Sequence, residues 1–220
     1  MMWITMSGSR NGSRPTPRRA VLAALGLVAM SLSGCSVLEP KPDSSRYFLL
    51  RSMAPPADAR VLDELVLGLG PFTMPEHIDR YEMLEFVGTY ELRYSATNRW
   101  IEPLGDQVRR TLSENLQAIL RPGAVLEYPW YATDGVDLQV SVEFDPIRLG
   151  GDGVWRGGID WVLRDSARSL LERNTVSFEV GPGAVAPEDV AQAWSGELER
   201  LATEIAAAVD RHFPVEGGPR

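Results

Sequence analysis

Two segments of the sequence repeat apolar residues every three or four positions, which is the spacing of one face of an α-helix. The first runs from Trp100 to Leu120, with the stripe Ile101, Leu104, Val108, Leu112, Leu116 and Leu120. The second opens at Pro187, ends before Pro214, and carries Val190, Trp194, Leu198, Leu201, Ile205 and Val209. Such stripes are usually buried in a core, although a partner protein is an alternative site of burial. We therefore expect both helices to pack on a common layer.

That layer is predicted to be a β-sheet, because the other apolar segments are short or alternate with polar residues. Leu65–Phe72 is apolar on both faces, so it is expected to be a central strand. The remaining predicted strands are Tyr47–Leu50, a hairpin of Met83–Val87 and Glu91–Ser95, Val125–Tyr128, and a meander of Val136–Arg148, Val154–Arg164 and Thr175–Val180, with Asp165–Arg173 as a connection. The pattern predicts an α+β fold, in which a mixed or mostly antiparallel sheet carries two amphipathic helices on one face.

The N-terminal 34 residues have the organisation of a secretory signal. Four arginines and no acidic residue precede an apolar run at 20–30, which is too short to span a bilayer. The run leads to Leu32-Ser33-Gly34-Cys35, which resembles the bacterial lipobox and contains the only cysteine of the chain. In such signals the cysteine becomes the lipid-modified first residue of the mature protein. A cysteine placed by chance in an ordinary signal is the alternative, and Arg18-Arg19 leaves twin-arginine export open.

The sequence thus predicts four regions. Residues 1–34 are a lipoprotein signal peptide, 35–45 are a lipidated N-terminus and tether, 46–213 are one domain, and 214–220 are a flexible tail. Several acyl chains on Cys35 would hold the protein firmly on a membrane. Ser36, by resemblance to bacterial lipoproteins with serine after the cysteine, favours the outer membrane.

The charge of the chain excludes some partners. The net charge is −8, and removal of the four leader arginines leaves the mature chain at −12. Nucleic-acid binding and adhesion to anionic lipid headgroups both require clustered basic residues, so neither is expected. Because the one thiol is assigned to the lipid, we also expect no disulfide.

No residue pattern predicts catalysis, a cofactor or a metal. His77 and His212 are the only histidines and lie far apart in the sequence, and a Gly-x-Ser-x-Gly motif is absent. Gly68-Leu69-Gly70 lacks the Lys-Ser/Thr pair of a phosphate loop, and Gly151-Asp152-Gly153 lacks the rest of a calcium loop. We interpret the acids in the middle of the chain as solvated turn and strand-end residues; they are Asp134, Asp137, Asp145, Asp152 and Asp160. An exposed subset of the tryptophans could line an apolar contact site.

An ordered series of short segments resembles the ABC-type transport auxiliary lipoproteins, the PqiC-like family. The segments are Tyr47–Leu50, Leu69–Pro75 with Asp79-Arg80, Arg99–Leu104, Glu114–Leu116, Tyr128–Trp130 and Val136–Phe144, all within residues 46–213. The resemblance implies a non-enzymatic lipoprotein on the periplasmic face of a Gram-negative outer membrane. It also implies that the lipoprotein works with an inner-membrane permease or other ABC components and with an MCE-domain protein. The lipoprotein would dock the lipid-conducting tunnel of that protein, either alone or as a homo-oligomeric ring.

Two other functions remain open from the residues alone. One is a structural or assembly lipoprotein of another envelope complex. The other is a periplasmic hydrolase, which would need two acids, or a serine and a histidine, to meet in a pocket.

Overall fold

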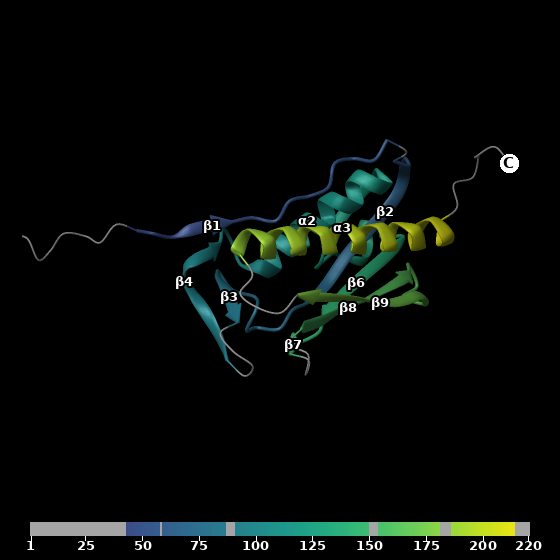
Figure 1. Cartoon of the computed structure of the whole chain (residues 1–220). Coiled ribbons are helices and arrows are strands. Elements are labelled where there is room, and N and C mark those ends of the chain that lie inside the picture. The colour runs from purple at the N-terminus through teal and green to yellow at the C-terminus, as the bar shows by residue number, and fades with distance from the viewer. Residues whose placement is uncertain (1–42, 58, 87–90, 150–153, 181–185, 214–220) are drawn as a thin grey trace, which may run out of the picture. The chain divides into compact units, whose positions relative to one another are not determined.

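The computed structural model describes residues 43–57, 59–86, 91–149, 154–180 and 186–213, and Ser44–Arg220 forms a compact unit on its own. Its larger sheet is built around β2 (Leu62–Thr73), which runs beside β6 (Leu138–Phe144) (Figure 1). β5 (Pro122–Glu127) pairs with the other edge of β2. Leu65, Leu67 and Leu69 of β2 are fully buried. The prediction of a central strand at Leu65–Phe72 is therefore confirmed.

The second half of this sheet is the predicted meander. β6 pairs antiparallel with β8 (Trp155–Asp165), β8 pairs antiparallel with β9 (Leu170–Val180), and the short β7 (Arg148–Leu149) also pairs with β8. Alternation places Leu138, Val140, Val142 and Phe144 in the core. The turn is shorter than expected, because β9 begins at Leu170 within the segment predicted to be a connection.

The strands form two sheets instead of the single sheet that the sequence suggests, although the α+β class is confirmed. The second sheet has the order β1-β4-β3, with β1 (Arg46–Phe48) parallel to β4 (Leu92–Trp100) and β3 (Glu82–Phe86) antiparallel to it. The predicted hairpin is thus present as β3 and β4, and its turn at 87–90 lies outside the described residues. β2 is parallel to both β5 and β6, since the chain crosses over between these strands.

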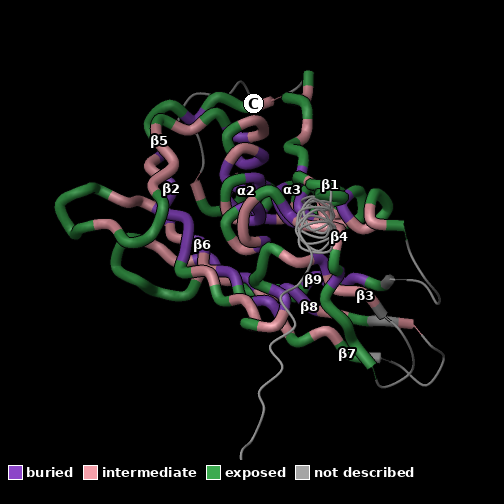
Figure 2. The backbone as a smooth tube through the Cα atoms, turned by 90° about the vertical axis from the view of Figure 1, so that its left-hand side faces the viewer, coloured by how far each residue is buried: buried purple, intermediate pink, exposed green. Residues whose placement is uncertain are grey.

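The helices α2 (Leu104–Leu120) and α3 (Pro187–His212) pack against each other and against the larger sheet. α2 begins four residues later than predicted, because Trp100 belongs to β4 and Pro103 has an extended ψ of 139°. Ile101 consequently stays 54% exposed, whereas the rest of its stripe is buried. Figure 2 shows the buried residues gathered along α2, β2, β6 and β8, where the helices and the sheet meet.

The chain enters this domain along its helices. Side chains of α2 and α3 accept hydrogen bonds from the backbone between β1 and β2: Gln107 from Leu50 N–H at 2.9 Å, Ser195 from Arg51 N–H at 3.1 Å, and Asn115 from Met53 N–H at 2.8 Å. Gln107 and Asn115 are fully buried. At the start of α3, Arg46 forms an ion pair with Glu188, whose pKa is lowered first by a backbone N–H and then by this arginine. The first residues of the domain are therefore fixed near the N-terminus of α3.

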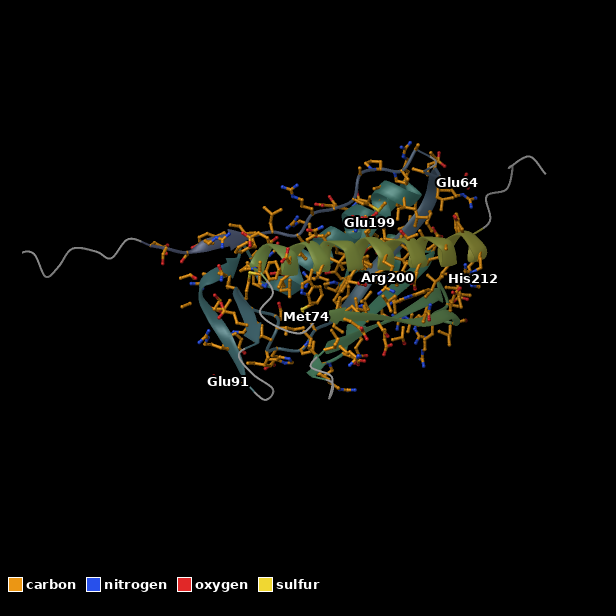
Figure 3. The ribbon with its side chains drawn as sticks, in the orientation of Figure 1. Glu64, Met74, Glu91, Glu199, Arg200 and His212 are labelled. Atoms are coloured by element: carbon orange, nitrogen blue, oxygen red, sulfur yellow. The ribbon has the colours of Figure 1, made fainter. Side chains whose placement is uncertain are left out.

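The exposed edge of β9 is closed in its middle by side chains. Arg200 of α3 donates to the carbonyl of Ser177 at 2.6 Å, and Asn174 accepts from the N–H of Thr175 at 2.9 Å. Figure 3 shows Arg200 between α3 and β9. Because open edges template strand pairing, this arrangement disfavours addition of another strand at β9. Among the described residues, the helices are also too short or too polar to cross a membrane.

Candidate partner-binding surface

The two histidines have separate structural settings. His212 lies in the last turn of α3, where its Nε2 is 3.4 Å from a Glu172 carboxylate oxygen, and Arg211 contacts the same carboxylate at 2.6 Å. This position agrees with the interpretation that a cation stabilises the helix C-terminus. His77 lies instead in the half-buried turn after β2. No described serine is hydrogen-bonded to either of them, and no described group of residues has the composition of a metal site.

The acidic residues in the middle of the chain serve local structure. Asp134 accepts from the N–H of Tyr131 at 2.7 Å, and Asp137 accepts from the N–H of Val66 at 2.8 Å. Asp160 accepts from the hydroxyl of Thr175 at 2.5 Å. These contacts support the interpretation as turn and strand residues. Asp152, with Gly151 and Gly153, lies outside the described residues, as does the whole lipobox from Leu32 to Cys35.

The tryptophans divide into core residues and partly exposed residues. Trp100 and Trp161 are buried, whereas Trp130 and Trp194 are partly exposed. Each of the latter pair lies at a different hollow in the surface. The predicted apolar contact site therefore resolves into two candidates, which differ in the chemistry of the residues around them.

Trp130 belongs to an aromatic turn, Tyr128–Tyr131, that follows β5 and lies on the sheet face opposite the helices. The ring of Trp130 meets the ring of Tyr128 edge to face, with 5.5 Å between centroids. Two glycines of β2 make room for this turn: a Cβ on Gly68 would lie 2.9 Å from Trp130, and one on Gly70 would lie 2.6 Å from the Cβ of Tyr128. Gly68-Leu69-Gly70 is thus a buried packing site for the aromatic turn.

A hollow of about 620 Å³, measured out to the open surface, lies beside this turn. It is lined by Trp130, Tyr131, Ala132, Val136, Gln139, Asp165, Ser166 and Arg168. The side-chain amide of Gln139 donates a hydrogen bond to the carbonyl of Gly70 at 3.2 Å, so its amide oxygen is still able to accept one. Tyr131 is 79% exposed although its backbone is tied to Asp134. The hollow therefore combines an aromatic wall with several groups able to form hydrogen bonds.

The other wall is the tight turn between β8 and β9. Asp165 closes it by accepting from the N–H of Ser169 at 2.7 Å, and the guanidinium of Arg164 donates to the carbonyl of Arg168 at 3.2 Å. Arg168 has a left-handed φ of 65°. Its guanidinium has no hydrogen-bond or ion-pair partner within the described part of the chain. Asp165 accepts a backbone N–H and keeps its negative charge, so the lining holds one carboxylate and one guanidinium. Of these two, the guanidinium of Arg168 is the one without a hydrogen-bond partner among the described residues.

The second candidate is an apolar groove beside the first turns of α3. Two adjoining hollows share Phe178, Val190 and Trp194, and the larger is also lined by Ile78, Glu82, Leu84, Trp100, Leu104 and Ile147. Trp194 packs on Phe144 and Phe178 with centroids 5.9 and 5.6 Å away. The acids at its rim are paired, Glu82 with Arg99, Glu179 with Arg156 and Glu197 with Arg200. This groove therefore has little charge with which to select a ligand.

Tyr131, Gln139, Ser166 and Arg168 were not singled out by the sequence. They come from a loop, a strand and a turn that are brought together only by the pairing of β6 with β8. The one sequence signal for this region is the exposed-tryptophan expectation, which includes Trp130.

Comparison with known proteins identifies the family. A family model described as ABC-type transport auxiliary lipoprotein component matches residues 47–206, which is most of the chain. The chain belongs to this family. The resemblance noted in the sequence is confirmed. No curated protein matches the chain.

Solved structures with this fold share little sequence with the chain. Protein XCC0632 from Xanthomonas campestris, of the family DUF330, is 13% identical, with a TM-score of 0.60 over 78% of this chain and all of that one. An uncharacterized protein is 16% identical, with a TM-score of 0.56 over 75% of this chain and 98% of that one. A PelC dodecamer from Paraburkholderia phytofirmans is 18% identical over 69% of this chain and 96% of that one, but its TM-score of 0.38 is too low to bear on assembly. The first two likenesses show the fold alone.

Proposed function

We propose that this protein is an outer-membrane-anchored periplasmic subunit of an MCE-type (Pqi-type) lipid transport system. In this role its domain docks the outer end of a periplasm-spanning MCE tunnel at the outer membrane. Inner-membrane permease or ABC components complete the system, and several copies of the lipoprotein can form a ring around the tunnel. The match of the transport auxiliary lipoprotein family across residues 47–206 carries this proposal.

The predicted anchor supports the same role. Cys35 stands at the end of a short apolar run as the last residue of Leu32-Ser33-Gly34-Cys35, and it is proposed to carry diacylglyceryl and N-acyl lipid. Residues 36–45 would then reach at most about 35 Å from the anchor to the domain. Ser36 favours the outer membrane over the inner membrane. Placement on that membrane is what a docking subunit requires, and no other cofactor is proposed.

A binding role fits the described chemistry better than a hydrolytic one. Among the described residues, no nucleophile is hydrogen-bonded to either histidine, and the central acids Asp134 and Asp137 hold a turn and a strand. The groove beside Trp194 instead presents mostly apolar side chains, and the hollow beside Trp130 combines aromatic rings with an arginine and other polar groups. Aromatic residues and arginine are enriched in contact sites between proteins. We therefore propose a non-enzymatic subunit.

The identity of the protein that binds this lipoprotein distinguishes the proposed function from an assembly role in another envelope complex. Crosslinked envelopes should yield an MCE-domain protein together with the tagged lipoprotein. Capture of assembly factors without any MCE-domain protein would refute the proposal.

The anchor has a separate test in Cys35→Ala. The variant should keep a folded domain but lose labelling by radioactive palmitate, because its thiol is the proposed acylation site. Labelling that persists in the variant would show that Cys35 is not the lipidated residue.

A further inference from the structure

We propose that the hollow between Trp130, Tyr131, Gln139, Ser166 and Arg168 is the docking site for a carboxylate-bearing peptide segment of the transport partner. This inference rests on the proposed function and names the surface that carries it out. It commits to a protein segment from the MCE-domain partner as the occupant. A second copy of this chain or a glycan is a competing occupant that the experiment separates.

The residue types around the hollow favour a protein occupant. Trp, Tyr and Arg are the residues that most often dominate the binding energy of protein interfaces, and all three meet here in Trp130, Tyr131 and Arg168. Tyr128, which is 55% exposed, extends the aromatic wall. Exposure of such large rings to water is unfavourable in the free protein, so their burial by a partner is favourable.

The charge of Arg168 indicates which chemical group the bound peptide segment carries. Arg168 is the cation of the hollow that has no partner among the described residues, whereas the nearby Asp165 already accepts the Ser169 N–H. A guanidinium presents paired N–H donors that match the two oxygens of a carboxylate. The free amide oxygen of Gln139 and the hydroxyl of Ser166 can accept and donate hydrogen bonds to peptide groups beside it. The segment is therefore expected to place an acidic side chain or a chain-terminal carboxylate at Arg168.

The walls of the hollow are fixed before any partner binds. Asp134 holds the backbone of Tyr131, Gly68 seats the ring of Trp130, and Asp165 closes the turn that presents Arg168. Little backbone conformational entropy is then lost from this side of the interface on binding, and the remaining cost is the ordering of the Tyr131 and Arg168 side chains. A surface that is both exposed and prearranged is what a docking site needs.

The position of the hollow suits a partner that arrives from the periplasm. The chain enters the domain at β1, where Arg46 contacts Glu188 at the start of α3. The start of α3 lies beside the C-terminal end of β9, since Trp194 of α3 packs on Phe178 of β9. The hollow lies at the opposite end of β8, which finishes at Asp165. The length of this strand separates the two places by roughly 30 Å. The hollow is therefore remote from the end of the domain at which the proposed tether begins.

The test uses the full-length lipoprotein, expressed at its natural level in the native envelope with a C-terminal tag. After crosslinking, the MCE-domain protein that co-purifies is quantified for wild type, Tyr131→Ala, Arg168→Glu, Arg168→Lys and the double variant Y131A/R168E. Tyr131→Ala and Arg168→Glu should each reduce capture at least about tenfold, as expected for interface hot spots. Arg168→Lys keeps the charge and should retain more capture than Arg168→Glu.

A matched control places the same changes at the entry end. Tyr47 is 56% exposed and Arg51 is exposed, so Y47A/R51E removes an aromatic ring and reverses a charge without touching the hollow. Its capture should stay within about twofold of wild type, and circular dichroism melting should show that every variant is folded.

The outcomes separate this inference from the proposed function. If wild type captures the MCE-domain protein and Y131A/R168E captures as much, the hollow is not the docking site and the function stands. If wild type captures none, both fail. A photo-crosslinker at position 131 should label the MCE-domain protein. Labelling of a second copy of this chain, or of glycan alone, would overturn the assignment.

Discussion

Gly70 is the residue on which the aromatic turn most depends. Its φ is +125°, which side chains rarely adopt, and an added Cβ would lie 2.6 Å from the Cβ of Tyr128. Gly70→Ala should therefore lower the free energy of unfolding by about 3 kcal/mol through strain and overpacking. Urea unfolding followed by circular dichroism measures this change.

Gly196 is a glycine at which alanine is expected to stabilise the protein, in contrast to Gly70. It is an exposed residue within α3, and a Cβ there would meet nothing within 4 Å. Gly196→Ala should raise the free energy of unfolding by about 0.5 to 1 kcal/mol, because alanine favours the helix. Equal effects of the two substitutions would contradict the packing described for Gly70.

Glu85 of β3 gives the hairpin a dependence on pH. A hydrogen bond from Ser95 and the ion pair with Arg93 lower the pKa of Glu85 below its ordinary 4.5, against the opposing effect of burial. A lowered pKa in the folded state means that ionised Glu85 stabilises the fold above about pH 4.5 and stops doing so as the pH falls through the folded value.

Glu85→Gln removes this contribution. The variant should be less stable than wild type at pH 7, and the difference should shrink as the pH is lowered below 4.5. Urea unfolding at pH 7 and below pH 4 tests the sign. A difference that grows in acid would show that the fold favours the protonated form.

The elements show which interactions a sequence can predict. Both apolar stripes, the central strand and the meander are local patterns, and each was recognised because its period belongs to one element. The predicted start of α2 is too early because Ile101 continues the apolar stripe toward the N-terminus, whereas Trp100 belongs to β4 and pairs with β1. The parallel pairings of β2 depend on where α2 returns the chain, which no local pattern encodes.

The hollow beside Trp130 was not predictable either, because no local pattern encodes the strand pairing that forms it. Tyr131 and Arg168 are 37 positions apart and meet only because Leu138 pairs with Asp165. Exposure of Tyr131 and the lack of a partner for Arg168 are properties of the folded chain. The lipobox and the region boundaries at 34/35, 45/46 and 213/214 stay predictions from sequence.

The segment between β1 and β2 is held on the helices by single side chains, of which Asn115 is the most testable. It is fully buried and accepts the N–H of Met53 at 2.8 Å. Asn115→Ala leaves this partly buried donor unsatisfied, so the free energy of unfolding should fall by about 2 kcal/mol. The amide of Met53 should exchange faster with deuterium, because the segment loses an attachment.

Ser113 of the same helix is the control for this prediction. Its hydroxyl contacts Gln117 within α2 and does not contact the segment. Ser113→Ala should leave the exchange of the Met53 amide unchanged. Equal acceleration in both variants would mean that the effect comes from α2 as a whole.

At the scale of the whole molecule, the acyl chains proposed on Cys35 would have to hold an acidic mature chain at the membrane. With a net charge of −12 after the leader is removed, the domain is repelled by anionic headgroups. The tether then sets how far the domain stands from the anchor. If residues 36–45 form the proposed tether, the reach of the domain toward a partner depends on their number.

Deletion of residues 37–42 tests this dependence on length. It shortens the reach of the tether by about 20 Å. Membrane fractionation and the melting temperature should be unchanged, since the anchor and the folded domain are both retained. Capture of the MCE-domain partner from crosslinked envelopes should fall several-fold, because the domain is held closer to the bilayer. Replacement of the same six positions by Gly and Ser keeps the length and should restore capture, whereas equal loss in both variants would show that the tether acts through its sequence.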